Sequence, residues 1–154
     1  DQTGKKRTKD AVTFLGQTMP WEHFGLEACD QQGIATAHTL AHTLEWMVNP
    51  PQGATKKVPQ TLLNDLIHMH EMHEAVAEER RRRGVELGRS GQEQVYWGPW
   101  MWRGYYRLKQ MAKRYKDDER GETIGALAKQ LYDDDFRAID WIGLAARWAD
   151  LLTR

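Results

Sequence analysis

The sequence predicts an all-α fold, a compact bundle of about five or six helices. Apolar residues recur at the i, i+3 and i+4 spacing of an amphipathic helix in each segment between proline, glycine or acidic residues. No stretch combines strict alternation with β-branched and aromatic residues, so we expect no β-strand. Amphipathic helices bury their apolar faces against one another, and a bundle follows from that requirement.

The 154-residue chain is expected to form a single helical domain over residues 19–154, after a flexible polar arm over residues 1–18. Its 40% hydrophobic and 29% charged residues are typical of a soluble protein with one core. No apolar run approaches the roughly 18 residues that span a bilayer. The single cysteine, Cys29, cannot form an internal disulfide. We therefore expect a cytoplasmic protein in which Cys29 is a small buried residue.

The first half of the domain is expected to contain helices over residues 21–29, 34–48 and 61–83. The second of these has one apolar face, formed by Ile34, Ala37, Leu40, Ala41, Leu44, Met47 and Val48. Pro50 and Pro51 end it because proline has no amide hydrogen to donate to the preceding turn. At the end of the third helix, Arg80–Arg83 complement the negative end of the helix dipole, and Gly84 is a natural C-cap.

The second half is expected to contain helices over residues 100–115, 122–132 and 133–152, after a glycine-rich loop over residues 84–94. Asp133–Asp135 are expected to open the last helix, because the N-terminal end of the helix dipole favours negative charge. This helix has a broad apolar face that we expect in the core, formed by Trp141, Leu144, Trp148, Leu151 and Leu152.

The segment from Arg80 to Lys116 combines positive charge with aromatic rings, although the whole chain has a formal net charge of zero. It contains eleven Lys and Arg residues and two acids, with three of the seven tryptophans and four of the five tyrosines. Cations neutralise phosphates and release counterions, and flat side chains stack on unpaired bases. The segment therefore indicates binding of RNA or single-stranded nucleic acid.

A helical projection of residues 100–115 separates a core stripe from the candidate contacts. The stripe consists of Met101, Tyr105, Leu108, Ala112 and Tyr115. The candidate phosphate contacts off this stripe are Arg103, Arg107, Lys109, Lys113 and Arg114, and the candidate stacking residues are Trp102 and Tyr106. In the alternative reading, Trp102 packs under the 84–94 loop and the cations form a solvated surface.

Arg81 and Arg82 are further candidate nucleic-acid contacts at the end of the preceding helix. They follow Glu78 and Glu79, so a solvated turn with internal ion pairs explains them at least as well.

The histidines support an alternative function, a metal-binding helical bundle of hydrolase or oxidase type. The candidate ligands are His38 and His42, with Glu45, on one helix and His70 and His73, with Glu74, on the next. Antiparallel packing would bring the two sets together, and these ligand types suit zinc or iron. The chain has no His-Glu-x-x-His motif, no phosphate-binding glycine loop and no GxSxG elbow. We therefore expect a binding protein without a metal or other cofactor, rather than an enzyme.

Two segments resemble the small all-helical subunit of type III CRISPR–Cas effector complexes. The first is residues 32–46, QGIATAHTLAHTLEW, in which a glycine precedes an apolar helix rich in leucine and alanine. The second is the terminal helix, where Phe136-Arg137-Ala138 and Trp141 precede the triplet Arg147-Trp148-Ala149. The tryptophan-dense stretch 96–102 departs from that family's pattern, as does the lack of a long N-terminal helix.

The resemblance implies a non-catalytic subunit of an antiviral ribonucleoprotein complex. Such a subunit stacks head to tail and supports the guide RNA and target strand through its basic face. The implied partners are nucleic acid, other subunits of the complex and further copies of the chain. A third possibility is a protein-interaction module of phage or toxin-system type, in which the aromatic residues form the partner interface.

Overall fold

The structure, a computed structural model, describes residues 11–53, 56–83, 95–96 and 98–154. This part of the chain forms six helices and one two-stranded antiparallel sheet. The helices are α1 (Trp21–Phe24), α2 (Ala37–Val48), α3 (Thr61–Arg82), α4 (Pro99–Arg114), α5 (Glu119–Asp133) and α6 (Ile139–Leu152). The predicted helical bundle is confirmed. The expected loop over 84–94, with its C-cap Gly84, lies outside the described residues.

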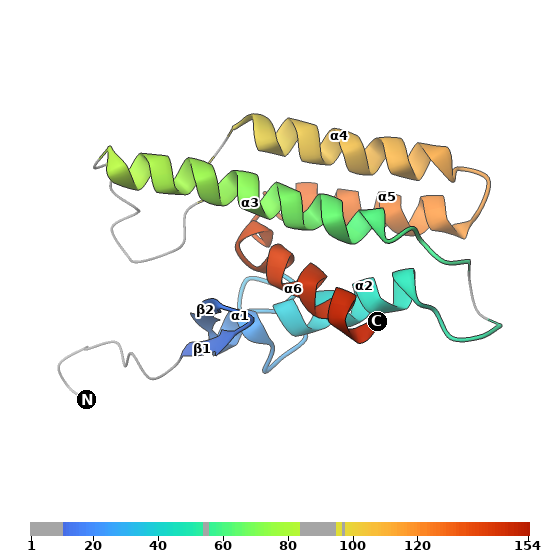
Figure 1. Cartoon of the computed structure of the whole chain (residues 1–154), viewed down its shortest axis with the longest axis horizontal. Helices are drawn as coiled ribbons and strands as arrows, with labels where there is room; N and C mark the ends of the chain where they lie inside the picture. The colour runs from blue at the N-terminus through green and yellow to red at the C-terminus, as the bar shows by residue number, and fades with distance from the viewer. Residues whose placement is uncertain (1–10, 54–55, 84–94, 97) are drawn as a thin grey trace.

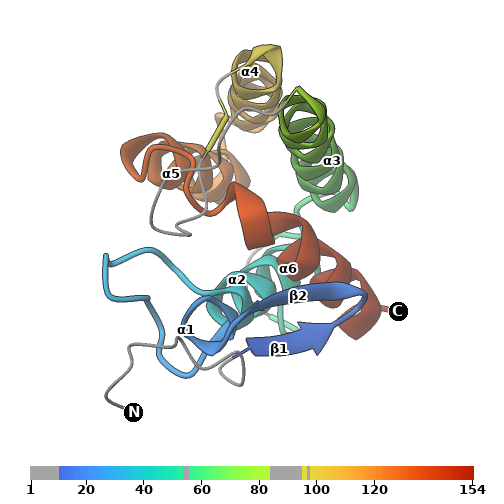
Figure 2. The same ribbon diagram turned by 90° about the vertical axis from the view of Figure 1, so that its left-hand side faces the viewer.

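The helices are arranged around α6. It packs against α3 on one side and α2 on the other, while α4 packs against α3 and α5 (Figure 1). Figure 2 shows α3, α4 and α5 at one end of the molecule, with α1, α2 and the two strands at the other. The basic-aromatic helix α4 is therefore an outer helix of the bundle.

Small residues make α6 a suitable central helix. Its buried residues are Ile139, Trp141, Ile142, Gly143, Leu144, Ala145, Ala146 and Ala149. The contact with α3 is tightest at Gly143, where an added Cβ would lie 2.6 Å from Cγ and Cδ2 of His70. The buried imidazole also donates from Nδ1 to the carbonyl oxygen of Ile139 over 2.6 Å. The His70 ring thus fills the space above Gly143, and its own Nδ1–H has a hydrogen-bond acceptor.

A β-hairpin near the N-terminus corrects the expectation of no strands. Strand β1 (Ala11–Phe14) lies in the arm predicted to be flexible and pairs with β2 (Gln17–Pro20), which begins in that arm. The Phe14 ring lies 4.9 Å from the Trp148 ring of α6, and Gln17 Nε2 donates to the carbonyl oxygen of Asp140. Strands of four residues are too short to produce a clear alternating pattern, and contacts with α6 hold them in place.

The last helix begins later than predicted. Asp133 ends α5 and pairs with Lys129, so the acids do not cap α6. Asp135 and Phe136 have φ values of 55° and 57°, which interrupt the helix while the Phe136 side chain is buried. Burial of this ring explains the turn that local charge did not predict.

The exposure of three apolar side chains also differs from expectation. Trp141 and Leu144 are buried and Trp148 is half-buried, but Leu151 and Leu152 at the end of α6 are exposed. Cys29, expected to be buried, is exposed as well. It lies in the connection before α2, where an isolated bridge pairs it with Ala35.

Asp118 fixes the turn between α4 and α5. Its carboxylate accepts hydrogen bonds from the Arg120 backbone N–H at 2.9 Å and from the guanidinium Nη2 at 2.7 Å. The guanidinium carbon of Arg120 lies 4.1 Å from the Tyr115 ring centroid. The side-chain hydrogen bond from Arg120 is the largest cause that lowers the pKa of Asp118, from 3.8 to about 2. Asp118 is thus an ionised N-cap for α5.

We expect Gly143→Ala to lower the free energy of unfolding by about 1–3 kcal/mol, because its Cβ would overpack against His70. Urea unfolding followed by circular dichroism measures this change. Gly125→Ala in α5 is the control, since a Cβ there meets the Ala112 Cβ at an ordinary 3.9 Å. Alanine favours helix, so the control should gain up to about 1 kcal/mol. Equal effects of the two substitutions would contradict the tight α3–α6 contact.

We expect the stability advantage of the wild type over Asp118→Asn to depend on pH. Because the pKa of Asp118 is lowered on folding, its ionised form stabilises the protein above the unfolded pKa. That contribution is lost as pH falls from about 4 to about 2. Asparagine keeps a capping oxygen and removes the titration. Urea midpoints of both proteins across this range measure the difference, and an advantage that stays constant down to pH 2 would contradict the assignment.

Candidate nucleic-acid interface

The outer face of α4 carries two parallel rows of side chains. The first row is Trp102, Tyr106, Lys109 and Lys113, and the second is Arg103, Arg107, Gln110 and Arg114. Steps of four, three and four residues keep each row on one side of a helix with about 3.6 residues per turn. All eight side chains are exposed. The predicted outward face of this helix is therefore confirmed.

The opposite face of α4 packs into the bundle. Trp100, Met101, Leu108 and Met111 are buried, while Tyr105, Ala112 and Tyr115 are half-buried. The predicted core stripe thus faces the interior of the bundle, with the half-buried tyrosines at its edge.

A hydrogen bond that His73 of α3 accepts, and a second bond within the chain, position the start of α4. The backbone N–H of Tyr96 donates to Nε2 of the buried His73 at 3.1 Å, and Trp100 Nε1 donates to the Tyr96 carbonyl at 2.8 Å. The guanidinium carbon of Arg80 lies 5.2 Å from the Tyr96 ring centroid. These contacts set which face of α4 points outward.

The cations of α4 differ in their partners. Nη1 of Arg107 lies 3.0 Å from Asp65 of α3, so a neighbouring helix supplies an acid that α4 itself lacks. For Arg103, Lys113 and Arg114, no carboxylate among the described residues lies within ion-pair distance. Lys109 Nζ lies 5.9 Å from the Tyr105 ring centroid. Within the described part of the chain, these three cations therefore have no acid to neutralise their charge.

The aromatic side chains of the face are largely exposed. Trp102 is 62% and Tyr106 is 63% exposed. Tyr132 of α5, which sequence reasoning missed, is 56% exposed, and its ring centroid lies 5.5 Å from that of Tyr105. Only the packing of α5 beside α4 reveals this neighbour. The alternative contact of Trp102 with residues 84–94 lies outside the described part of the chain.

Arg81 and Arg82 sit in a network of ion pairs. Arg81 lies 3.3 Å from Glu78 and 3.9 Å from Glu74, and Arg82 lies 3.7 Å from Glu78. This geometry favours the reading in which the end of α3 is a solvated turn with internal ion pairs. Exposed pairs of this kind reduce the charge available to a phosphate.

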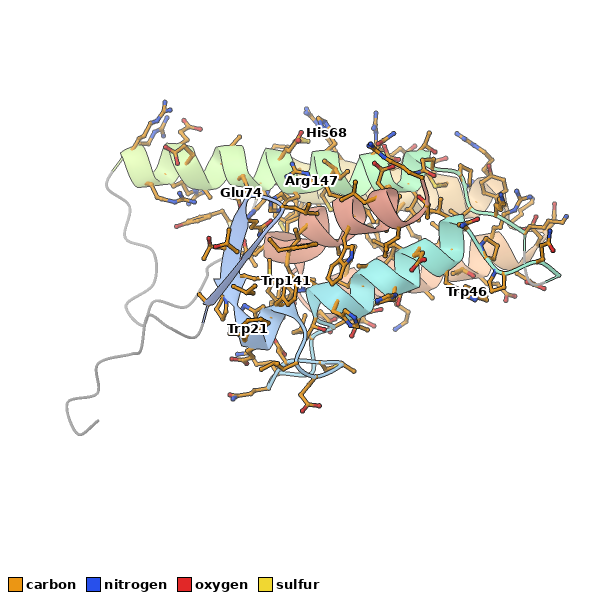
Figure 3. The ribbon with its side chains drawn as sticks, turned by 60° about the horizontal axis from the view of Figure 1, so that its bottom comes forward. Trp21, Trp46, His68, Glu74, Trp141 and Arg147 are labelled. Atoms are coloured by element: carbon orange, nitrogen blue, oxygen red, sulfur yellow. The ribbon has the colours of Figure 1, made fainter. Side chains whose placement is uncertain are left out.

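The four histidines of the metal alternative do not converge. His38 and His42 lie on α2, where their Nε2 atoms are 3.1 Å apart. His70 and His73 lie on α3 and bond to the backbone at Ile139 and Tyr96. The joint site is not formed because α6 lies between α2 and α3 (Figure 3).

His73 joins Glu74 and Asp140 in one group of potential metal ligands. Its Nδ1 lies 3.6 Å from the Glu74 carboxylate and 3.8 Å from that of Asp140. Because Nε2 accepts the Tyr96 N–H, the neutral ring carries its proton on Nδ1, between the two carboxylates. The neighbouring His73 side chain is the largest cause that lowers the pKa of Glu74. A metal at Nδ1 would move the ring proton to Nε2 and so break the bond from the Tyr96 N–H that precedes α4.

A second group of potential ligands combines Glu22, His23 and Asp30. Asp30 Oδ1 accepts hydrogen bonds from the backbone N–H groups of Gln32 and Ile34, at 2.8 and 2.9 Å. The His23 ring stacks on Trp141 with a centroid distance of 4.5 Å. These contacts shape the connection that leads into α2.

Comparisons of the chain with protein families, curated proteins and solved structures find no match. The resemblance to the CRISPR–Cas small subunit thus depends on the two quoted segments, which include α2 and α6 of the core. Within the described ranges, no helix is both long and apolar enough to cross a membrane.

Proposed function

We propose that this protein is a non-catalytic helical subunit that binds single-stranded nucleic acid, RNA in particular, through the outer face of α4. The observation that carries the proposal is the exposure of Trp102 and Tyr106 one turn apart, beside cations that have no carboxylate partner among the described residues. Large exposed rings within a cationic face are the combination that single-strand-binding proteins use.

The cations and the aromatic rings of this face have different roles in binding. The guanidinium groups of Arg103 and Arg114 form charge-assisted hydrogen bonds with phosphate oxygens, and Lys113 adds a point charge. The rings of Trp102 and Tyr106, which lie beside the arginine row, stack on the bases of the nucleic acid. Every base has a flat face, so this mode of binding tolerates many sequences.

A ribonucleoprotein context follows from the resemblance to the CRISPR–Cas small subunit. In that context the partners are RNA, other subunits and head-to-tail copies of this chain, in the cytoplasm. Exposed apolar side chains away from α4, such as Leu151 and Leu152 at the end of α6, offer contact area to neighbouring subunits. Subunit association and nucleic-acid binding would then use different surfaces.

We expect the triple variant Arg103→Gln, Lys113→Gln and Arg114→Gln to flatten the dependence of log affinity on log salt by about two units, since each single-strand phosphate contact contributes about 0.7. Arg107 is left intact because it pairs with Asp65. Fluorescence anisotropy with labelled oligo-U and oligo-dT, between about 50 and 200 mM salt, measures the slope. The assay is run on the free protein and on the native complex isolated from cells.

The charge-matched control for this triple variant is Lys56→Gln, Arg137→Gln and Arg154→Gln. These cations are also exposed but lie outside α4. The control should keep the wild-type slope in both settings. If both triple variants change the slope equally, binding reflects net charge alone and the α4 interface is wrong.

We expect Trp102→Ala to lose about 1–3 kcal/mol of nucleic-acid affinity with an almost unchanged salt slope, because stacking releases no counterions. The same titrations measure both quantities. Trp46→Ala is the control, since Trp46 is 44% exposed on α2 at the other end of the molecule. Full nucleic-acid affinity together with lost association of a protein partner would instead assign Trp102 to a protein interface.

A further inference from the structure

His38 and His42 form a pair on the exposed side of α2 that the proposed function does not use. They lie one helical turn apart, both side chains are exposed, and their ring centroids are 4.4 Å apart. The two Nε2 atoms point at each other over 3.1 Å. Two histidines at i and i+4 on one helix face are the spacing that helical zinc motifs use.

The separation of the two nitrogens suits a shared metal ion. Two bonds of about 2.05 Å to nitrogens 3.1 Å apart enclose an angle of about 100° at the metal. This value lies between the angles of square-planar and tetrahedral coordination. The distance between the two nitrogens therefore fits chelation of one ion.

Glu45 prepares His42 for this role. Its Oε2 lies 3.3 Å from His42 Nδ1, so the tautomer with the proton on Nδ1 places that proton next to the carboxylate and leaves the Nε2 lone pair available. A carboxylate behind a ligating histidine is the usual outer-shell arrangement at protein metal sites. In that tautomer and without metal, His42 Nε2 accepts a hydrogen bond from the Nε2–H of His38. Metal binding requires only that the neutral His38 ring carry its proton on Nδ1 instead.

Surrounding elements hold the two rings in place. The Trp148 ring lies 5.4 Å from the His38 ring and 6.1 Å from the His42 ring. An added Cβ at Gly25 would lie 2.4 Å from the His38 Cβ, so only glycine lets the chain after α1 approach α2 here. The positions of the two histidine side chains are therefore restricted by α6 and by the segment that follows α1.

We propose that His38 and His42 form a surface site for an exchangeable divalent transition-metal ion, namely Cu²⁺, Ni²⁺ or Zn²⁺. Imidazole ligands suit these ions, whereas Mg²⁺ and Ca²⁺ require oxygen ligands. Two protein ligands leave the other coordination positions to water, so the metal exchanges with solution. The site goes beyond the nucleic-acid function, because α2 and α4 lie at opposite ends of the molecule (Figure 2).

The test is isothermal titration of the untagged, metal-free full chain with Cu²⁺, Ni²⁺, Zn²⁺ and Mg²⁺ at about pH 7.5. We expect one transition-metal ion per chain, with Cu²⁺ bound most tightly and Mg²⁺ not bound. His38→Ala and His42→Ala should each lower the affinity about tenfold or more, and Glu45→Gln by about 10- to 100-fold. At about pH 5 the binding should be lost, because protonated imidazoles are not ligands.

His68→Ala is the matched control, since His68 is an exposed histidine on α3, well separated from α2 (Figure 3). It should bind metal like the wild type, and circular dichroism should show that all variants are folded. Wild-type affinity in both His38→Ala and His42→Ala, or an equal loss in His68→Ala, would place the metal elsewhere and overturn the proposal. If the wild type binds no transition metal, the two histidines are only hydrogen-bonded to each other, and the proposal is overturned as well.

Discussion

The close contact of α3 with α6 is the constraint on which the rest of the structure depends. It exists because Gly143 has no side chain and the His70 ring occupies the space. A buried imidazole without a partner would cost about 1–3 kcal/mol, and the Ile139 carbonyl removes that cost. With α3 fixed, its next turn presents His73 to the Tyr96 amide and thereby sets the start of α4. The orientation of the proposed binding face thus originates in the core.

The same arrangement gives four of the six histidines separate roles. On α3, two buried rings bond to the backbone and position neighbouring segments. On α2, His38 and His42 face solvent and one another, with Glu45 behind them. Because α6 separates the two helices, no single site can collect all these ligands. The fold therefore gives the buried histidines a structural use and leaves the exposed pair accessible for the proposed metal ion.

The two proposed sites are both built from side chains of a single helix. Each is a row of side chains at helical spacing on an outer helix, held by buried residues on the other side of that helix. The α4 face adds one tertiary feature, the ion pair of Arg107 with Asp65, which lowers the number of cations free for phosphates. A ligand on one face leaves the other accessible, since α2 and α4 lie at opposite ends of the bundle.

The sequence by itself determined the five long helices of the described residues and the outward rows of α4, because these follow from periodicity within one segment. It also placed His38 beside His42, one turn apart. It did not determine the extent of the first helix, expected over residues 21–29 and present only over Trp21–Phe24, or the exposure of Leu151 and Leu152 at the end of α6. Tertiary structure decided the features that depend on distant residues. Packing on α6 orders the hairpin that begins at Ala11, and burial of the Phe136 ring delays the start of α6. The insertion of α6 between α2 and α3 separates the histidines, because the small residues of α6 let it approach both neighbours closely, and no local pattern records which helices will meet.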